Sequence, residues 1–80
     1  MKFVVYERSC INRIQDVGVL GIFTSWDQAC SAIKLKRLKM IDMFGIAKFF
    51  LDHPERAKLF SFDGEKGEKV SWWIDKRVEL

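Results

Sequence analysis

The chain has few of the residues that support metal, redox and disulfide chemistry. Its 80 residues include two cysteines, one histidine and one proline. Two cysteines are too few for a disulfide-stapled miniprotein. Cys10, Cys30 and His53 cannot together supply the four ligands of a structural zinc site. We therefore expect no metal site, no cofactor, and two buried free thiols in a reducing cytosol.

Long hydrophobic runs are also missing from the sequence. No window approaches the roughly 18 apolar residues that a membrane-spanning helix requires. The apolar run at the N-terminus is interrupted by Glu7 and Arg8, which argues against a signal peptide. The sequence thus predicts no membrane association and a cytoplasmic location.

Catalytic motifs are missing as well. The sequence contains no phosphate-cradling Gly-rich loop, no HExxH or GxSxG motif, and no carboxylate cluster at metal-ligand spacing. The stretch Asp52-His53-Pro54 is typical of a helix-capping turn, and both cysteines are distant from it in sequence. The chain is therefore predicted not to be an enzyme.

What the chain does have is apolar and aromatic side chains, which make up 49% and 14% of its residues. That content is too high for a disordered tail and predicts a single globular domain over residues 1–80. A domain of this size buries only about 60% of the surface that its unfolded chain exposes. We therefore expect part of the apolar surface to remain exposed.

Sequence patterns in the first half predict two strands and a long helix. β-Branched and aromatic residues indicate strands over residues 2–6 and 17–24, joined by a loop over residues 8–16. Glycines within the second strand indicate a bulge or a close approach of the backbone. Ser25 and Gln28 fit the capping box of a helix that continues to about residue 43, where Gly45 ends or kinks it.

The second half predicts a small helical insertion and two strands. Residues 46–51 fit a helical segment, Pro54 fits the start of a short helical turn to about residue 59, and residues 60–62 fit a strand. From residue 70 onward apolar and polar residues alternate, as in a half-buried strand. The predicted fold is α+β: a three- or four-stranded, mainly antiparallel sheet packs one face on the long helix.

The stretch Val19-Leu20-Gly21-Ile22-Phe23-Thr24-Ser25, with Ala29 early in the following helix, resembles a recurring pattern of short phage and bacterial proteins. These proteins begin with a strand similar to residues 2–7, continue with a "GVFSS…A" step, and end with an aromatic, acidic strand similar to residues 72–80. The resemblance covers roughly residues 2–34 and 70–80, and residues 45–62 depart from it. It implies a fold and a phage-like or accessory-gene setting, but no activity and no functional residues.

A basic helix raises the possibility of nucleic-acid binding. The formal net charge is +3, and Lys34, Lys36, Arg37 and Lys39 are closely spaced. On a helical wheel, however, these four side chains surround the helix, whereas duplex-binding proteins cluster their cations on one face. Arg37 points into the apolar arc of this helix, where its stem can cover the edge of the core. The arc consists of Trp26, Ala29, Cys30, Ile33, Met40, Ile41 and Phe44. An alternative nucleic-acid surface is a sheet face with Tyr6, Trp73 and Arg77, whose rings could stack on bases.

Surplus aromatic residues point instead to protein contact. Trp73 lies on the otherwise polar side of its strand, Leu35 and Leu38 point away from the apolar arc, and the insertion is rich in Phe. Exposed aromatic residues combined with Arg are frequent anchors of protein interfaces. If the insertion does not fold back to cover its Phe residues, the chain is expected to dimerise or dock on a partner.

The function hypothesis is a small non-enzymatic interaction module of phage or mobile-element type. It would bind, and modulate or inhibit, a host defence or regulatory protein. The predicted partner-binding residues are Trp73, Arg77, Phe49, Phe50 and His53. The alternative is a small nucleic-acid-binding or nucleotide-binding protein that uses the basic helix over residues 34–39.

Overall fold

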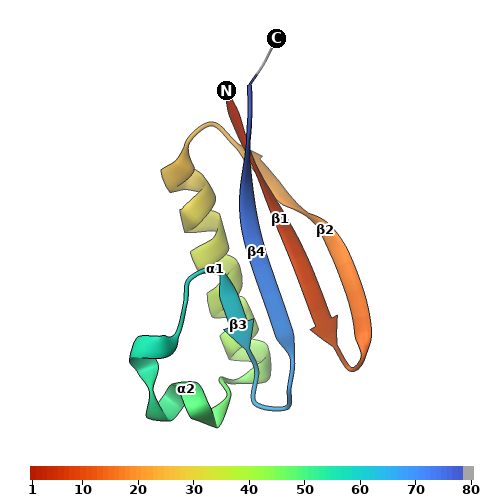
Figure 1. The fold of residues 1–80 in the computed structure, drawn as a ribbon, viewed down its shortest axis with the longest axis vertical. Helices are drawn as coiled ribbons and strands as arrows, with labels where there is room; N and C mark the ends of the chain where they lie inside the picture. Colours follow the sequence, from red (N-terminus) through yellow and green to blue (C-terminus); the bar gives the residue numbers. More distant parts are fainter. Residues whose placement is uncertain (79–80) are drawn as a thin grey trace.

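A computed structural model describes residues 1–78 and shows four strands and one long helix in two layers (Figure 1). The elements follow in the order β1 (Lys2–Ile11), β2 (Ile14–Phe23), α1 (Trp26–Phe44), α2 (Lys48–Asp52), the 3-10 turn η1 (Pro54–Arg56), β3 (Ser61–Asp63) and β4 (Lys69–Arg77). The strand order is β2-β1-β4-β3, and every neighbouring pair is antiparallel. The predicted α+β fold is therefore confirmed. Residues 79–80, which end the stretch that carries the resemblance, lie outside the described residues.

Strands β1 and β2 form a hairpin that is much longer than the sequence patterns predict. Its turn consists of Asn12 and Arg13 alone, with φ values of 53° and 66°. Two consecutive residues with positive φ are typical of a type I′ turn, whose twist matches that of the flanking strands. The loop predicted over residues 8–16 is therefore wrong. The pattern was missed because the second turn position holds Arg where Gly is usual.

The predicted bulge is present in β2. Val5 pairs with Gly21 and Tyr6 pairs with Val19, so that Leu20 is the extra residue. The bulge changes which side chains of β2 face α1, because one additional residue reverses the alternation of the strand.

Helix α1 begins and ends at the predicted positions. The Ser25 hydroxyl accepts a hydrogen bond from the backbone N–H of Gln28 at 3.1 Å. The Gln28 side chain reaches back to Thr24, so the capping box closes one residue earlier than its usual form. Gly45, with a φ of 72°, donates its N–H to the carbonyl of Ile41 and ends the helix.

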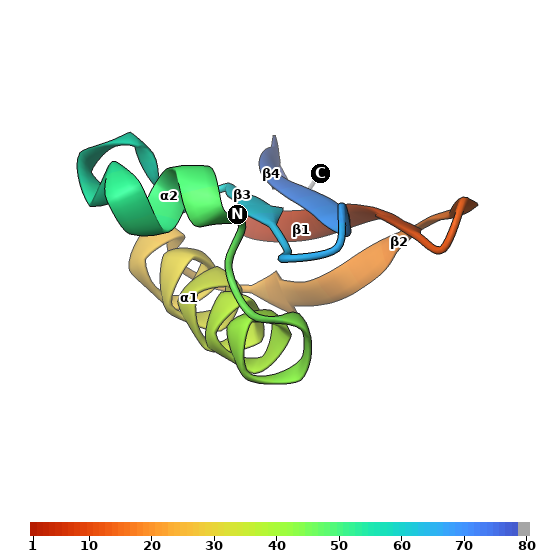
Figure 2. The same ribbon diagram turned by 90° about the horizontal axis from the view of Figure 1, so that it is seen from below.

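The core lies between α1 and one face of the sheet, as Figure 2 shows from below. Its buried apolar side chains are Val5, Ala29, Ile33, Met40, Phe62, Val70 and Trp72. The predicted apolar arc of α1 supplies three of them, while Cys30, Ile41 and Phe44 are half-buried on the same arc. Both cysteines are free, but each is half-buried rather than fully buried.

The insertion occupies the end of the molecule opposite to the start of β1 and the end of β4 (Figure 1). Its α2 helix and η1 turn lie to the side of β3, next to one edge of the sheet (Figure 2). The loop before α2 is tied to this edge, because the N–H of Ala47 donates to the carbonyl of Asp63 at 3.0 Å. Both short elements lie within about three residues of their predicted positions, although the turn after Pro54 ends at Arg56.

The molecule is elongated and exposes more surface than a domain of its mass normally does. Its radius of gyration is 13.5 Å, compared with about 12 Å for a typical 80-residue domain. Its accessible surface is 5967 Å², compared with about 5000 Å² for a compact monomer of 9.4 kDa. Within residues 1–78, no helix is both long and apolar enough to cross a membrane.

Candidate functional site

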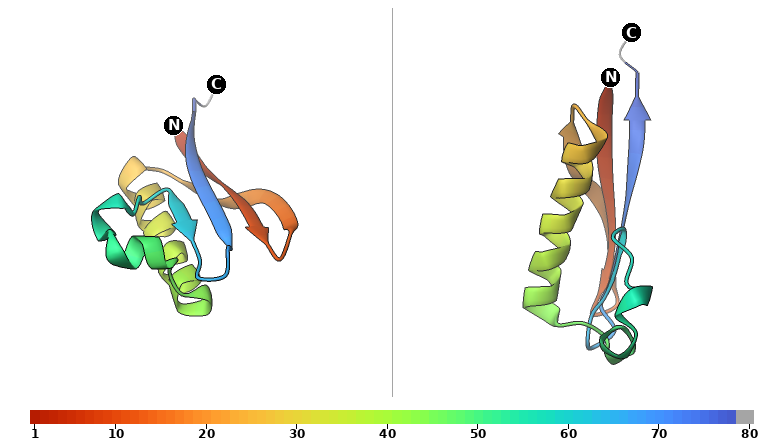
Figure 3. Two further views of the ribbon diagram at one scale, coloured as in Figure 1. Left: turned by 60° about the horizontal axis from the view of Figure 1, so that its bottom comes forward. Right: turned by 90° about the vertical axis from the view of Figure 1, so that its left-hand side faces the viewer.

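The sheet has a second face, turned away from α1, which we call the open face (Figure 3). Strand alternation and the pairing register assign its side chains, because residues that pair across antiparallel strands share a face. The open face carries Val4, Tyr6, Arg8 and Cys10 from β1, Gln15, Val17, Val19 and Ile22 from β2, Ser61 and Asp63 from β3, and Lys69, Ser71, Trp73, Asp75 and Arg77 from β4.

An aromatic pair lies at the centre of the open face. Tyr6 and Trp73 pair across the two central strands, and their rings stack with centroids 5.5 Å apart and planes inclined by 18°. Trp73 remains 40% exposed. The two rings therefore present an apolar surface on rigid strands, on the side of the sheet opposite the core.

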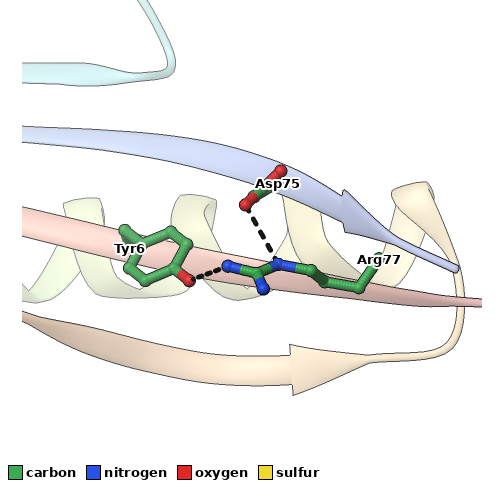
Figure 4. A network of polar contacts seen from close by, with 3 residues as sticks. All are labelled: Tyr6, Asp75 and Arg77. Carbon is green, nitrogen blue, oxygen red and sulfur yellow. Dashed lines mark hydrogen bonds and ion pairs between the residues drawn. The ribbon is translucent and has the colours of Figure 1, made fainter. Parts of the chain in front are cut away.

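Arg77 links this pair to an acidic neighbour (Figure 4). Its guanidinium donates from Nη2 to the Tyr6 hydroxyl at 2.9 Å and from Nε to the Asp75 carboxylate at 3.1 Å. Tyr6 in first place, and then Asp75, raises the pKa of Arg77 above its ordinary value. Since an arginine is charged at all physiological pH values, the direction of this shift means only that the guanidinium stays positive.

Apolar residues of β2 continue the open face beyond Tyr6. Val17, Val19 and Ile22 are all more than half exposed. They follow one another along the outer strand of the sheet, next to the half-buried Val4 and Tyr6 of β1. The resulting stripe of aliphatic side chains beside an aromatic pair is the arrangement expected at the centre of a protein interface.

A shallow hollow of about 320 Å³ lies at the other end of the open face. Cys10, Ser61, Phe62, Val70 and Ser71 line it together with three charged residues, Arg8, Asp63 and Lys69. Lys69 and Asp63 form an ion pair at 4.0 Å across the edge of this hollow. The hollow thus adds a polar rim with one positive charge in excess.

The predicted residues of the insertion form a second, separate cluster. The ring of Phe49 contacts Phe50 at 5.3 Å and His53 at 5.0 Å between centroids, and the guanidinium of Arg56 lies 5.9 Å from it. The Nδ1 atom of His53 lies 3.7 Å from the Oε1 atom of Glu55. The insertion covers its own aromatic residues only in part, because Phe50 is half-buried and Phe49 is exposed.

The structure therefore brings Trp73 and Arg77 together, and brings Phe49, Phe50 and His53 together, but it separates the two groups. The first group lies on the open face of β4, whereas the second lies on α2 and η1 beyond β3 (Figure 1). A single partner would have to wrap around the β3 edge to touch both groups. The open face is the larger and more rigid of the two surfaces, because its side chains stand on paired strands.

The basic residues of α1 do not form one surface. Lys34 and Lys39 are exposed, whereas Lys36 and Arg37 are half-buried. The Arg37 Nε donates to the carbonyl of Ser61 at 2.9 Å, which ties α1 to β3. Arg37 thus has the structural role that its place in the apolar arc predicts.

The described residues offer no grouping suited to metal binding. No three His, Cys, Asp or Glu side chains among residues 1–78 are placed to hold a metal ion. Cys10 lies on the open face and Cys30 lies on the sheet-facing arc of α1.

No protein-family model matches this chain, and no curated protein or solved structure matches it either. The resemblance to short phage and bacterial proteins therefore stays a prediction. The candidate site rests on the geometry of the open face alone.

The sequence patterns do not predict two parts of the open face as a protein-binding surface. They indicate Tyr6 only as a base-stacking residue, and they do not indicate the exposed valines of β2. The alternation of Val17 and Val19 was the available signal, but the glycines and the bulge that follow them conceal which face these residues occupy.

Proposed function

We propose that this protein is a non-enzymatic interaction module that binds a partner protein through the open face, centred on Trp73 and Arg77. The observation that carries the proposal is the Tyr6–Trp73 stack held by Arg77, on a sheet face opposite the only long helix among residues 1–78. Tyr, Trp and Arg are the residues most enriched at interface hot spots. The flanking aliphatic side chains of β2 would exclude water around them.

The rigidity of this surface supports the same proposal. Binding costs free energy for each side chain that must be immobilised, about 0.5–1.5 kcal/mol for a flexible one. The rings of Tyr6 and Trp73 restrict each other, and Arg77 is held by two hydrogen bonds before any partner arrives. An interface assembled on these residues would therefore retain most of the free energy gained by desolvation.

The partner class follows from the resemblance to phage proteins. A host defence or regulatory protein is the proposed target, and binding would modulate or inhibit it. A partner that covers the open face needs an apolar surface for the aromatic pair and acceptor groups for the free N–H groups of Arg77.

The test is capture from bacterial lysate followed by titration of the purified partner. Wild-type chain, Trp73→Ala and Leu38→Ala are immobilised in parallel, because Leu38 is an exposed apolar residue on α1 and serves as the matched control. We expect a partner that wild type and Leu38→Ala bind, and that Trp73→Ala binds at least tenfold more weakly. Equal affinity of all three variants for every captured protein would refute the open-face assignment.

The second candidate function is nucleic-acid binding, and one observation favours it. Arg8, Lys69 and Arg77 share the open face with the aromatic pair, as in sheets that stack single-stranded bases. Two of these cations are already paired with Asp63 and Asp75, which weakens the electrostatic term.

Anisotropy titrations with single-stranded oligonucleotides at two salt concentrations separate the two functions. Binding that weakens steeply with salt and is lost in Trp73→Ala would support nucleic-acid recognition by the open face. Binding lost instead in Lys34→Ala/Lys39→Ala would place it on the basic helix. Absence of salt-sensitive binding would leave the protein-binding function as the one to pursue.

A further inference from the structure

The two edges of the sheet differ in length and in protection. Strand β3 has three residues, and the insertion lies beside it. Strand β2 has ten residues, and its outer side pairs with no described strand. Natural proteins normally protect a long edge with Pro, Lys, a β-bulge or a covering element, because unpaired backbone groups there recruit another strand. The bulge of β2 lies at Leu20, so the edge over residues 14–19 is uninterrupted. Residues 14–23 contain no Pro, Lys or Arg, and Asp16 is the one charged residue among them.

The backbone of β2 offers hydrogen-bonding groups on its outer side. In a two-residue hairpin the residues that flank the turn exchange both backbone hydrogen bonds, and the pairs then alternate. Ile14 pairs with Ile11 next to the Asn12–Arg13 turn. The N–H and C=O groups of residues 15, 17 and 19 therefore point away from β1, up to the bulge at Leu20. These residues also place their side chains on the open face.

The excess of exposed surface over that of a compact monomer matches the area that a second copy would bury. The chain exposes about 1000 Å² more than a compact monomer of its mass, from 5967 Å² against about 5000 Å². A standard protein interface buries about 800 Å² on each partner. The most exposed of the large apolar residues along β2, Ile14 at 70% and Ile22 at 62%, contribute to this excess.

An antiparallel two-fold pairing of β2 with itself is free of charge conflicts. If the axis passes through Val17, this residue lies opposite Val17 of the partner subunit, and Gln15 lies opposite Val19 of the partner subunit. Asp16 then lies opposite Gly18 of the partner subunit, and the space around Gly18 is open, since nothing lies within 4 Å of a Cβ built there. The one charged residue of the strand is thus accommodated.

The same pairing gives the exposed hairpin tip a place to pack. Ile14 lies on the α1 side of the sheet, since it pairs with Ile11, and it would reach Leu20 of the partner subunit. Beside the end of β2, Phe23, Ala32 and Leu35 line an apolar hollow of about 470 Å³, which also contains Asp27. The adjacent tip residue Arg13 carries the opposite charge to Asp27.

From these observations we infer that the protein is a homodimer in which β2 pairs antiparallel with β2 of a second copy, so that the two sheets form one eight-stranded sheet. Strand addition of this kind uses the backbone for affinity and alternate side chains for specificity. The dimer leaves the Tyr6–Trp73 pair of each copy uncovered. The dimer and the proposed partner surface share Val17 and Val19 of β2 but not the aromatic pair, so molar mass and partner capture by Trp73→Ala test the two proposals separately.

The first test is molar mass by light scattering over a range of protein concentrations. We expect wild type and Leu38→Lys to approach twice the monomer mass of 9.4 kDa as concentration rises. Val17→Lys should remain monomeric at concentrations where wild type dimerises, because two lysines would face each other at the axis. Circular dichroism checks that Val17→Lys is folded. A wild type that remains a monomer up to millimolar concentration overturns the inference, as does a Val17→Lys variant that dimerises like wild type.

A charge-reversal pair tests the geometry independently of folding. Val17→Lys and Val17→Glu should each be monomeric alone and should form a heterodimer on mixing. Recovery of the dimer mass on mixing supports pairing near Val17. If neither variant dimerises alone and the mixture also stays monomeric, the two-fold pairing through β2 is wrong. If wild type dimerises but Trp73→Ala abolishes the dimer, the copies meet through the open face instead.

Discussion

Trp72 and Trp73 are neighbours in β4 and lie in opposite environments. Trp72 faces α1, is 3% exposed, and donates its indole N–H to the Glu7 carboxylate at 2.8 Å. Trp73 faces the open side, is 40% exposed, and stacks on Tyr6. Two tryptophan side chains, adjacent in sequence, thus differ in role: Trp72 belongs to the core, and Trp73 stays exposed on the other face. One face of this sheet therefore packs against α1, and the other stays exposed to solvent.

The two faces also differ in how much of their apolar surface is removed from water. Complete burial of a large apolar side chain contributes about 1.5–3 kcal/mol, and the α1 side of the sheet collects this contribution from several residues. Side chains on the open face retain much of their contact with water. Substitutions should therefore lower stability strongly on the α1 side and weakly on the open side.

The largest effect is expected for Ile33→Ala. Ile33 is fully buried between α1 and the sheet, so truncation removes apolar contacts and leaves a cavity. We expect a loss of about 2–5 kcal/mol in the free energy of unfolding, measured by urea denaturation. Leu35→Ala, on the exposed side of the same helix, is the control and should change stability by less than about 0.5 kcal/mol. Similar losses for both would show that α1 packs differently.

A smaller loss is expected for Trp72→Phe. Phenylalanine keeps an aromatic ring in the core but removes the donor to Glu7, which is half-buried. Hydrogen bonds to charged groups contribute about 1.5–3 kcal/mol, and the loss should lie in that range. In Glu7→Gln the acceptor oxygen is retained, so this variant should lose less. Equal stability of wild type and Trp72→Phe would mean that the indole–carboxylate bond contributes nothing.

Trp73→Ala tests the other tryptophan and should cost less than Trp72→Phe. It removes an aromatic pair worth about 0.5–1.5 kcal/mol from a site where much of the ring is already in water. The urea midpoint should therefore decrease only slightly, while partner binding is lost. If Trp73→Ala were as unstable as Ile33→Ala, the open face would belong to the core, and its loss of binding would reflect unfolding.

The smallest effect is expected for Arg77→Met. Methionine keeps an apolar side chain of similar length but cannot donate to Tyr6 or Asp75. Since the guanidinium is exposed to solvent, we expect an unchanged melting temperature together with weaker partner binding. Trp73 fluorescence should also change, because the neighbouring Tyr6 ring is no longer held by Arg77. An unchanged affinity would restrict the binding site to the aromatic pair.

Most of the fold could be predicted from local patterns in the sequence. The capping residues Ser25 and Gln28, the terminating Gly45, and the alternation in β4 each act within a few residues, so the sequence alone locates them. The β1–β2 hairpin was the exception. Its turn adopts positive φ at Asn12 and Arg13, and the long-range pairing along both strands stabilises that conformation.

The candidate site was predicted in part. The exposure of Trp73 beside Arg77 followed from strand alternation, and both lie on the open face. The connection to Tyr6 depends on a register between residues 71 positions apart, which no local pattern encodes. Phe49, Phe50 and His53 do cluster, but sequence order could not show that α2 lies beyond β3, away from Trp73.

The sequence by itself determined most elements of this protein outside the β1–β2 hairpin, the residues that cap its long helix, and the excess of apolar side chains over what 80 residues can bury. These features depend on composition and on interactions between near neighbours. Only the tertiary structure decided which face of the sheet and which of its edges remain open. That choice arises from the strand order β2-β1-β4-β3 and from the bulge at Leu20, because long-range pairing determines which side each residue of β2 faces.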